Sequence, residues 1–222
     1  MIPLRDSQPS YSTPFVTAGL IGANVLVFLY QLTLDSYTLN HLVAAYGVVP
    51  ARLELSTLVT SMFLHGGWLH LIGNMWFLWI YGDNVEDILG PAKYLLFYLA
   101  CGVAAALVHV AFNPESRIPT IGASGAIAGV MGAYMVKFPH SRIVTLVPVF
   151  FFLTLIEIPA SIILVYWFVI QIFSGVGSLA YSTASQGGVA WFAHAGGFLA
   201  GMLLVGALRP RPRYRRREDL HW

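Results

Sequence analysis

Long apolar runs alternate with short polar segments along this chain, and the polar segments carry most of the charges. A helix needs roughly 20 predominantly apolar residues to cross the hydrocarbon core of a membrane. The pattern predicts six membrane-spanning helices, at residues 15–34, 68–81, 92–112, 122–136, 147–173 and 189–208. The second helix is expected to have an amphipathic lead-in that begins at Leu58.

The polar segments between these runs are predicted to be connections. They cover residues 1–13, 35–56, 82–87, 113–119 and 175–188. The first is expected to be a flexible lead, and the third a turn that ends the second span. Pro148 and Pro159 fall inside the fifth predicted span, where we expect them to kink the helix.

The composition agrees with a membrane protein. Of the 222 residues, 57% are hydrophobic and 10% are charged, whereas soluble domains carry about 25% charged residues. Six spans and their connections leave no room for a separate soluble domain. We therefore predict an all-α polytopic membrane protein with a short cytosolic lead at 1–14, a six-transmembrane-helix bundle at 15–208 and a basic cytosolic tail at 209–222.

The basic residues divide unevenly between the two sides of the predicted membrane. Six spans place both termini on one side, together with every Lys and Arg except Arg52 and Arg117. The positive-inside rule then places both termini in the cytosol. Anchoring to anionic lipid explains the arginine tail with fewer assumptions than nucleic-acid binding, so no nucleic-acid partner is expected.

Four polar side chains inside the predicted spans lie at a similar depth. We estimate each depth from the helical rise, measured along the helix from the first charged residue at its cytosolic end. By this estimate, His70 and Ser124 lie roughly 20 Å from that residue and His194 roughly 22 Å. Asn74 lies one turn from His70. In a core of about 30 Å this level is roughly 10 Å below the outer surface. Each residue alone is more often a packing or helix-bonding residue, but their convergence favours a site.

The faces of these helices agree with the depths. His70 and Asn74 are spaced i, i+4 and share one face. Small residues allow close approach beside the other two polar residues, with Gly125, Gly129 and Gly132 near Ser124 and Gly197 and Gly201 near His194. We therefore expect the sixth helix to pack on the fourth, so that His194 faces Ser124.

This arrangement suits nucleophilic catalysis. A serine hydroxyl needs a base to take its proton, and histidine is the usual base. Backbone N–H groups at the start of the fourth helix, with His70 and Asn74, could then stabilise an oxyanion. The acidic residues Glu86 and Glu157 lie towards the cytosolic side, so the sequence predicts a Ser–His dyad without an acidic third member.

Three motifs resemble those of the rhomboid family of intramembrane serine proteases. They are Gly122-Ala123-Ser124-Gly125, His70-x-x-x-Asn74 and Ala193-His194-Ala195-Gly196-Gly197-x-x-x-Gly201. The resemblance covers about residues 58–208, and the run at 60–76 is similar to prokaryotic members. The three motifs in this order on the second, fourth and sixth spans are a specific signal.

The resemblance implies roles for individual residues. Ser124 would be the nucleophile and His194 the general base, with His70, Asn74 and the Ser124 backbone N–H lining the oxyanion hole. His65 matches a further family histidine, which is expected to be structural and near the water-filled mouth.

Further residues would support the site. They are Glu86, which matches an acidic position with a structural hydrogen-bonding role, and the motif glycines Gly122, Gly125, Gly197 and Gly201. The family cleaves transmembrane helices of other proteins near their outer end, which implies membrane-protein substrates and no metal or cofactor. The compact form leads us to expect a prokaryotic plasma membrane.

Two positions depart from some well-studied bacterial members. Ser56-Thr57 stands where those members carry a Trp-Arg pair in the first outer loop. Ala128 stands where some members carry a tyrosine that stacks on the catalytic histidine. Another residue must then hold the ring of His194, or the ring is held less firmly.

Specificity is expected to come from an entrance between the second and fifth spans and from the outer loop at 175–188. Trp167, Phe168 and Phe173 could line this entrance, but contact with lipid is the favoured interpretation.

Three other functions remain open. A catalytically silent adaptor would typically have lost the serine or the histidine, and both are present. A metal site on His65, His70 and His194 lacks the H-E-x-x-H spacing. A transporter would place its polar residues nearer the midplane.

Overall fold

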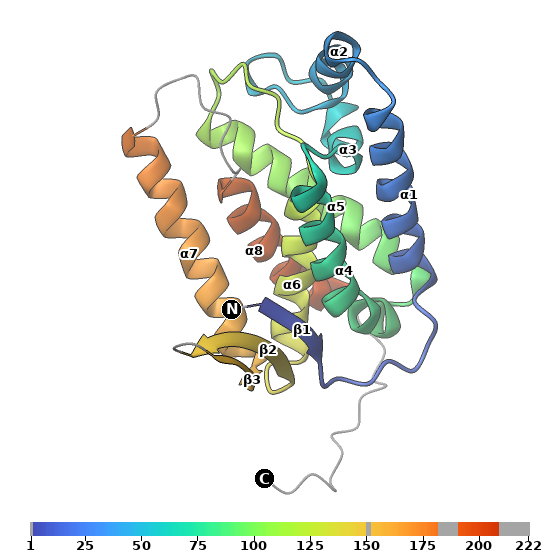
Figure 1. The fold of residues 1–222 in the computed structure, drawn as a ribbon, viewed down its shortest axis with the longest axis vertical. Helices are drawn as coiled ribbons and strands as arrows, with labels where there is room; N and C mark the ends of the chain where they lie inside the picture. The colour runs from blue at the N-terminus through green and yellow to red at the C-terminus, as the bar shows by residue number, and fades with distance from the viewer. Residues whose placement is uncertain (1, 150–151, 182–190, 209–222) are drawn as a thin grey trace, which may run out of the picture.

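The computed structural model describes residues 2–149, 152–181 and 191–208, and these form a helical bundle with a small sheet at one end (Figure 1). The α-helices are α1 (Phe15–Leu32), α2 (Ser36–Tyr46), α3 (Thr57–Thr60), α4 (Trp68–Leu89), α5 (Pro91–Phe112), α6 (Ser124–Lys137), α7 (Ala160–Tyr181) and α8 (Trp191–Ala207). Two short 3-10 helices are η1 (Pro50–Arg52) and η2 (Ser61–Phe63). The strands are β1 (Ile2–Asp6), β2 (Arg142–Val149) and β3 (Phe152–Pro159).

The helix α6 forms the centre of the bundle. Every residue from Gly125 to Tyr134 is buried, because α4, α5, α7 and α8 all pack against it. Its 14 residues give a length of about 21 Å. The residues that surround α6 therefore decide what lies beside Ser124 at its first turn.

In the part of the chain that the structure describes, two helices are long and apolar enough to cross a membrane. They are α1 and α5, at 18 and 22 residues. Shorter apolar stretches lie in α7, at Ala160–Ser174, and in α8. The structure thus has apolar helices of membrane-spanning length, in agreement with the composition.

Glycines bring α6 and α8 into direct backbone contact. A Cβ atom built on Gly201 would lie 1.9 Å from the carbonyl oxygen of Gly129, and one on Gly197 would lie 2.1 Å from that of Gly125. A Cβ on Gly132 would lie 2.1 Å from the carbonyl oxygen of Phe198. Real Cβ atoms do not approach other atoms this closely. Any side chain at these positions would push the two helices apart.

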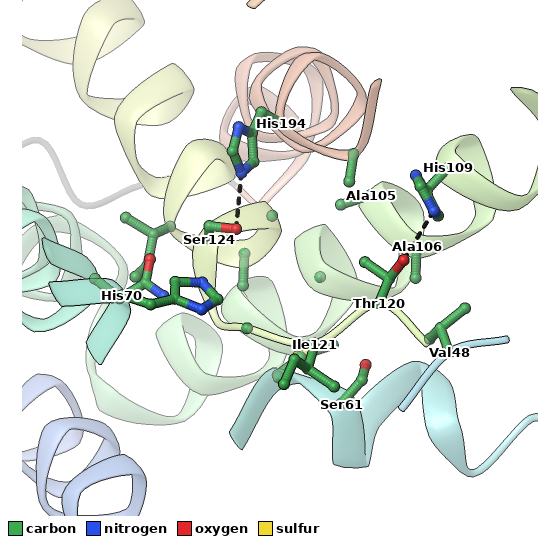
Figure 2. Close-up of a pocket in the computed structure, with 18 of the residues that line it drawn as sticks. Val48, Ser61, His70, Ala105, Ala106, His109, Thr120, Ile121, Ser124 and His194 are labelled. Carbon is green, nitrogen blue, oxygen red and sulfur yellow. Dashed lines mark hydrogen bonds between the residues drawn. The ribbon is translucent and has the colours of Figure 1, made fainter. Parts of the chain in front are cut away.

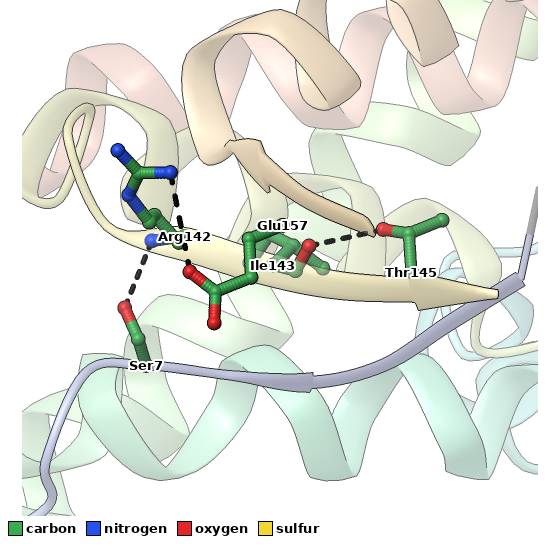
Figure 3. Close-up of polar contacts among 5 residues, drawn as sticks. All are labelled: Ser7, Arg142, Ile143, Thr145 and Glu157. Carbon is green, nitrogen blue, oxygen red and sulfur yellow. Dashed lines mark hydrogen bonds and ion pairs between the residues drawn. The ribbon is translucent and has the colours of Figure 1, made fainter. Parts of the chain in front are cut away.

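The small sheet corrects the prediction of an all-α fold. Its strand order is β1-β2-β3, with both pairs antiparallel. The segment 1–13, expected to be a flexible lead, instead contributes β1, which pairs with β2 from Ile2 opposite Leu146 to Asp6 opposite Ile143. Hydrogen bonds extend the pairing, since the Arg142 N–H donates to the hydroxyl of Ser7 at 2.9 Å (Figure 3).

The fifth predicted span also begins later than expected. Residues 147–149 belong to β2 and residues 152–159 to β3, and α7 starts at Ala160. The segment is rich in Val, Ile and Phe, which favour strands. Pro159 ends the hairpin, and a proline disfavours helical geometry in the residue before it. Across this hairpin, Arg142 on β2 and Glu157 on β3 form an exposed ion pair at 3.9 Å (Figure 3).

Three predicted connections are helical in whole or in part. The segment 35–56 contains α2, whose start is capped because the Asp35 carboxylate accepts hydrogen bonds from the N–H groups of Tyr37 and Thr38. The predicted turn at 82–87 lies inside α4. This helix ends at Leu89 and is capped by Gly90, which has a φ of +78°. The predicted loop at 175–188 is helical as far as Tyr181, and its remaining residues lie outside the described ranges.

Glu86 explains why α4 continues through a polar segment. This residue is 1% exposed, and its carboxylate accepts hydrogen bonds from the N–H groups of Val16 and Thr17, at 2.9 and 2.8 Å, and from the Thr17 hydroxyl at 2.8 Å. A carboxylate is stabilised by the unpaired N–H groups at a helix N-terminus. Glu86 therefore fixes the start of α1 against α4.

We expect Glu86→Ala to destabilise the protein by about 2 kcal/mol or more, because two buried donors of Thr17 and the part-buried N–H of Val16 would lose their acceptor. Thermal unfolding in detergent would measure the effect, with the exposed Glu115→Ala as the control variant. Equal melting temperatures for the two variants would contradict this role of Glu86.

We expect Gly201→Ala to destabilise the protein by about 1–3 kcal/mol, because its methyl group would overlap the backbone of α6. The matched control is Gly206→Ala on the same helix, where a Cβ would meet nothing within 4 Å. Unfolding of both variants in the same detergent gives the comparison. If Gly201→Ala were as stable as Gly206→Ala, backbone contact would not limit the spacing of α6 and α8.

Candidate active site

The first turns of α6 and α8 bring a serine and a histidine together. The Oγ atom of Ser124 lies 2.8 Å from Nε2 of His194, which is hydrogen-bonding distance (Figure 2). Ser124 is the first residue of α6, and His194 lies three residues after the start of α8. The glycine contacts between these two helices set the distance, because they allow the backbones to touch beneath the pair.

The loop before α6 needs a glycine at position 122. Gly122 has a φ of +126°, a conformation that other residues rarely adopt. A Cβ atom there would lie 2.6 Å from Nε2 of His70. The Gly122 N–H donates to the carbonyl oxygen of Ser61 at 2.9 Å, which holds the loop in place. The loop can therefore run directly beside the His70 ring.

His70 lies beside Ser124 across this loop (Figure 2). Its Nδ1 atom accepts a hydrogen bond from the N–H of Gly66 at 3.3 Å. When one nitrogen of a neutral imidazole accepts, the other nitrogen carries the hydrogen. Nε2 of His70, next to Gly122, is therefore the donor of this ring and is available on the side of the cavity.

Asn74 and His65 form a second pair behind His70. The Nδ2 atom of Asn74 lies 3.0 Å from Nε2 of His65, and the rings of His65 and His70 meet edge to face at 5.0 Å. His65 is 2% exposed, and its N–H and carbonyl groups bond to the side-chain amide of Gln31 on α1. His65 is thus a buried residue that ties α1 to the start of α4.

A cavity of about 800 Å³ opens beside the Ser124–His194 pair. His70 and Asn74 line it, and so does Trp167 from α7. Figure 2 shows Ser124, His194 and His70 grouped on one side of this space, with Thr120 and His109 on the other. The Thr120 hydroxyl and Nε2 of His109 are 2.9 Å apart. The cavity is large enough to hold several residues of an extended peptide.

The second nitrogen of the His194 ring has a partner that the sequence analysis missed. Nδ1 of His194 lies 2.7 Å from Oε1 of Gln171 on α7, and Gln171 is 5% exposed. The Trp167 ring lies one turn away on α7, at 5.8 Å from the His194 ring. Gln171 and Trp167 thus contact the His194 ring, as a tyrosine is expected to do in the family members that carry one at the position of Ala128.

The sequence did hold a signal for Gln171, which is the only amide in the apolar run at 160–174. Polar residues in such runs are rare and tend to mark function.

The favoured interpretation of Trp167 as a lipid-facing residue was wrong, because it contacts His194 and lines the cavity. Phe168 is also turned inwards and stacks on Phe198 at 4.9 Å. Phe173, at 74% exposed, remains on the surface of the bundle.

The remaining predicted site residues lie around the pair or away from it. Gly125 and Gly197 form the α6–α8 contact next to the pair, and Gly201 continues this contact one turn further on. Glu86 lies at the junction of α1 and α4, where its carboxylate accepts hydrogen bonds from the start of α1. Among the residues that the structure describes, no group of three or more His, Cys, Asp or Glu side chains could hold a metal ion.

Comparison with known proteins agrees with this geometry. The rhomboid domain profile matches residues 52–211 of the chain, more than two thirds of its length. The chain is 33% identical over 145 residues to the mitochondrial presenilin-associated rhomboid-like protein of Rattus norvegicus, which covers 60% of the chain and 36% of that relative.

Two further relatives come from yeast and from a bacterium. The chain is 30% identical over 135 residues to the mitochondrial rhomboid protein 1 of Saccharomyces cerevisiae, covering 58% of the chain and 38% of the relative. It is 32% identical over 135 residues to the rhomboid protease GluP of Bacillus subtilis, covering 59% and 25%. The match thus spans little more than a third of these relatives at most. On the strength of the profile match, the chain belongs to the rhomboid family.

Proposed function

We propose that this chain is an intramembrane serine endopeptidase that hydrolyses peptide bonds in or near transmembrane segments of other membrane proteins. Ser124 is the nucleophile and His194 is the general base. The observation that carries the proposal is the 2.8 Å contact between Ser124 Oγ and His194 Nε2 beside a cavity. Family membership and the name of the bacterial relative as a rhomboid protease support it.

The reaction follows from this contact. His194 takes the hydroxyl proton as Ser124 Oγ attacks the peptide carbonyl carbon, which gives a tetrahedral oxyanion. The intermediate collapses when the C–N bond breaks and His194 returns the proton to the leaving amine. Water then attacks the acyl ester with His194 again as base, which releases the new carboxyl terminus and restores Ser124.

Donors for the oxyanion surround the same point. The first N–H groups of α6 have no carbonyl partner within the helix, and the Ser124 N–H is one of them. His70 offers its Nε2 hydrogen beside Gly122. Asn74 is 7% exposed, and one N–H of its amide remains free for a ligand when the other is bonded to His65. Preorganised donors of this kind contribute much of the rate in acyl transfer.

The proposal includes how the chain lies in the membrane. The six long helices α1, α4, α5, α6, α7 and α8 are the transmembrane segments of one domain at 15–208, with both termini in the cytosol of a prokaryotic cell. The tail at 209–222, which lies outside the described residues, anchors to anionic lipid. Ser124 begins α6 at the end away from Lys137, so cleavage occurs near the outer end of the substrate helix. Two of the similar proteins are named as mitochondrial and a third comes from a bacterium.

The test is cleavage of a transmembrane test substrate by purified protein in liposomes. We expect Ser124→Ala and His194→Ala each to lower kcat/KM by at least about 1,000-fold, since each removes one member of a unit that acts together. The exposed residues Ser10 and His140 supply matched controls, as Ser10→Ala and His140→Ala. Mass spectrometry of the products locates the cleaved bond.

If Ser124→Ala cleaves as fast as the wild type, the serine is a packing residue and an adaptor that binds membrane helices becomes the better description. Loss of activity with a chelator would contradict a serine enzyme that needs no metal. Cleavage at the cytosolic end of the substrate would contradict the proposed depth.

A further inference from the structure

A side chain of α7 contacts the candidate base from the side opposite the serine. Gln171 is 5% exposed on a helix whose other polar groups are few. A buried amide in an apolar helix is costly unless its hydrogen-bonding groups have partners. Both ends of this amide have one, because Oε1 lies 2.7 Å from Nδ1 of His194 and Nε2 donates to the carbonyl oxygen of Trp167 at 3.3 Å.

These two contacts fix the orientation of the amide. The Trp167 carbonyl oxygen can only accept, so it must face the NH₂ group of Gln171. A flipped amide would place two oxygens against each other and lose that bond. Oε1 therefore faces His194, and Nδ1 of His194 must be the donor in this contact.

The orientation of the amide decides the tautomer of the histidine. A neutral imidazole with its hydrogen on Nδ1 has an unprotonated Nε2. Nε2 is the atom that lies 2.8 Å from Ser124 Oγ, and only in this tautomer can it accept the hydroxyl hydrogen. The other tautomer would direct a hydrogen towards Ser124 and could not act as a base.

Two tryptophan rings also pack beside the His194 ring. The Trp167 ring lies 5.8 Å from the His194 ring at an interplanar angle of 34°, and the Trp191 ring lies 6.3 Å away at 85°. Gln171 and Trp167 are spaced i, i+4 on α7 and present one face to the histidine. Gln171 therefore bonds to one edge of the His194 ring, and the Trp167 and Trp191 rings pack beside it.

We propose that Gln171 is a positioning residue that holds His194 in the tautomer and orientation required of the base. This inference rests on the proposed protease function and adds a third member to the pair, with a neutral amide in the place where soluble serine proteases use a carboxylate. A neutral group suits this location, because an ionised side chain within the membrane costs several kcal/mol unless it is paired or hydrated.

The first test compares three variants in liposomes by kcat and KM, normalised to the folded fraction from size-exclusion chromatography. Gln171→Met keeps the size of the side chain and removes the acceptor, whereas Gln171→Glu keeps an acceptor oxygen. Asn24→Leu is the matched control, because Asn24 is a fully buried amide on α1 whose Nδ2 donates only to its own helix at Leu20.

We expect Gln171→Met to lower kcat about 10- to 100-fold with KM changed less than about 2-fold, a loss typical of removing the group that orients a histidine. The decrease in log kcat for Gln171→Glu should be at most half of the decrease for Gln171→Met. Asn24→Leu should leave kcat within about 2-fold of the wild type. An unchanged kcat in Gln171→Met, or equal losses in Gln171→Met and Asn24→Leu, would overturn the inference.

A second measurement is made on the wild type and does not depend on the folding of the Gln171 variants. Nitrogen NMR of protein with ¹⁵N-labelled histidine, with the His194 signals assigned by difference against His194→Ala, reports which ring nitrogen carries the hydrogen. We expect it on Nδ1 in the wild type, and finding it mainly on Nε2 would overturn the proposal. If no variant and not even the wild type cleaves any substrate, the protease function fails, while the NMR result still decides the role of Gln171.

Discussion

The structure depends on the direct backbone contact between α6 and α8. Helices in a membrane gain little from apolar side chains alone, because lipid is equally apolar, so close packing of small residues holds them together. Here Gly129 and Gly201 allow two backbones to meet with no side chain between them. The residues at the first turns of these helices, Ser124 and His194, are brought to 2.8 Å as a result. The proposed chemistry is therefore a consequence of packing that extends along both helices.

Several polar side chains of the interior bond to one another as neutral pairs. Gln171 bonds to His194, and Asn74 lies within bonding distance of His65. Two carboxylates, Glu86 and Asp87, are buried as well, and Glu86 is placed where the N-terminus of α1 supplies three donors. Satisfied networks of this kind rigidify a site, whereas partly satisfied ones destabilise it. Since Gln171 belongs to α7 and His194 to α8, the proposed base keeps its partner only while these two helices remain packed together.

Much of the site could be predicted from local sequence, because motif spacing, helical rise and small-residue faces are local properties. The pairing of Ser124 with His194 followed from their matching depth, from the small-residue faces beside them and from the three motifs. The contact of Gln171 with His194 could not be predicted in this way, because the position of Gln171 along the helix depends on where α7 begins. The apolar run at 147–159 looked like part of that helix. Short apolar runs do not distinguish strands from helices. The polar segment at 82–87 looked like a turn because the partners of Glu86 lie about 70 residues away in sequence.

The most direct test of the central claim is the reaction of the protein with a fluorophosphonate, which modifies activated serines, followed by peptide mass spectrometry. If the hydroxyl of Ser124 is activated by His194, a single adduct should form on Ser124 and should be absent from His194→Ala. Ser61 also lines the cavity, which makes it an internal comparison. An adduct on Ser61 as often as on Ser124, or equal labelling of His194→Ala and the wild type, would contradict the account.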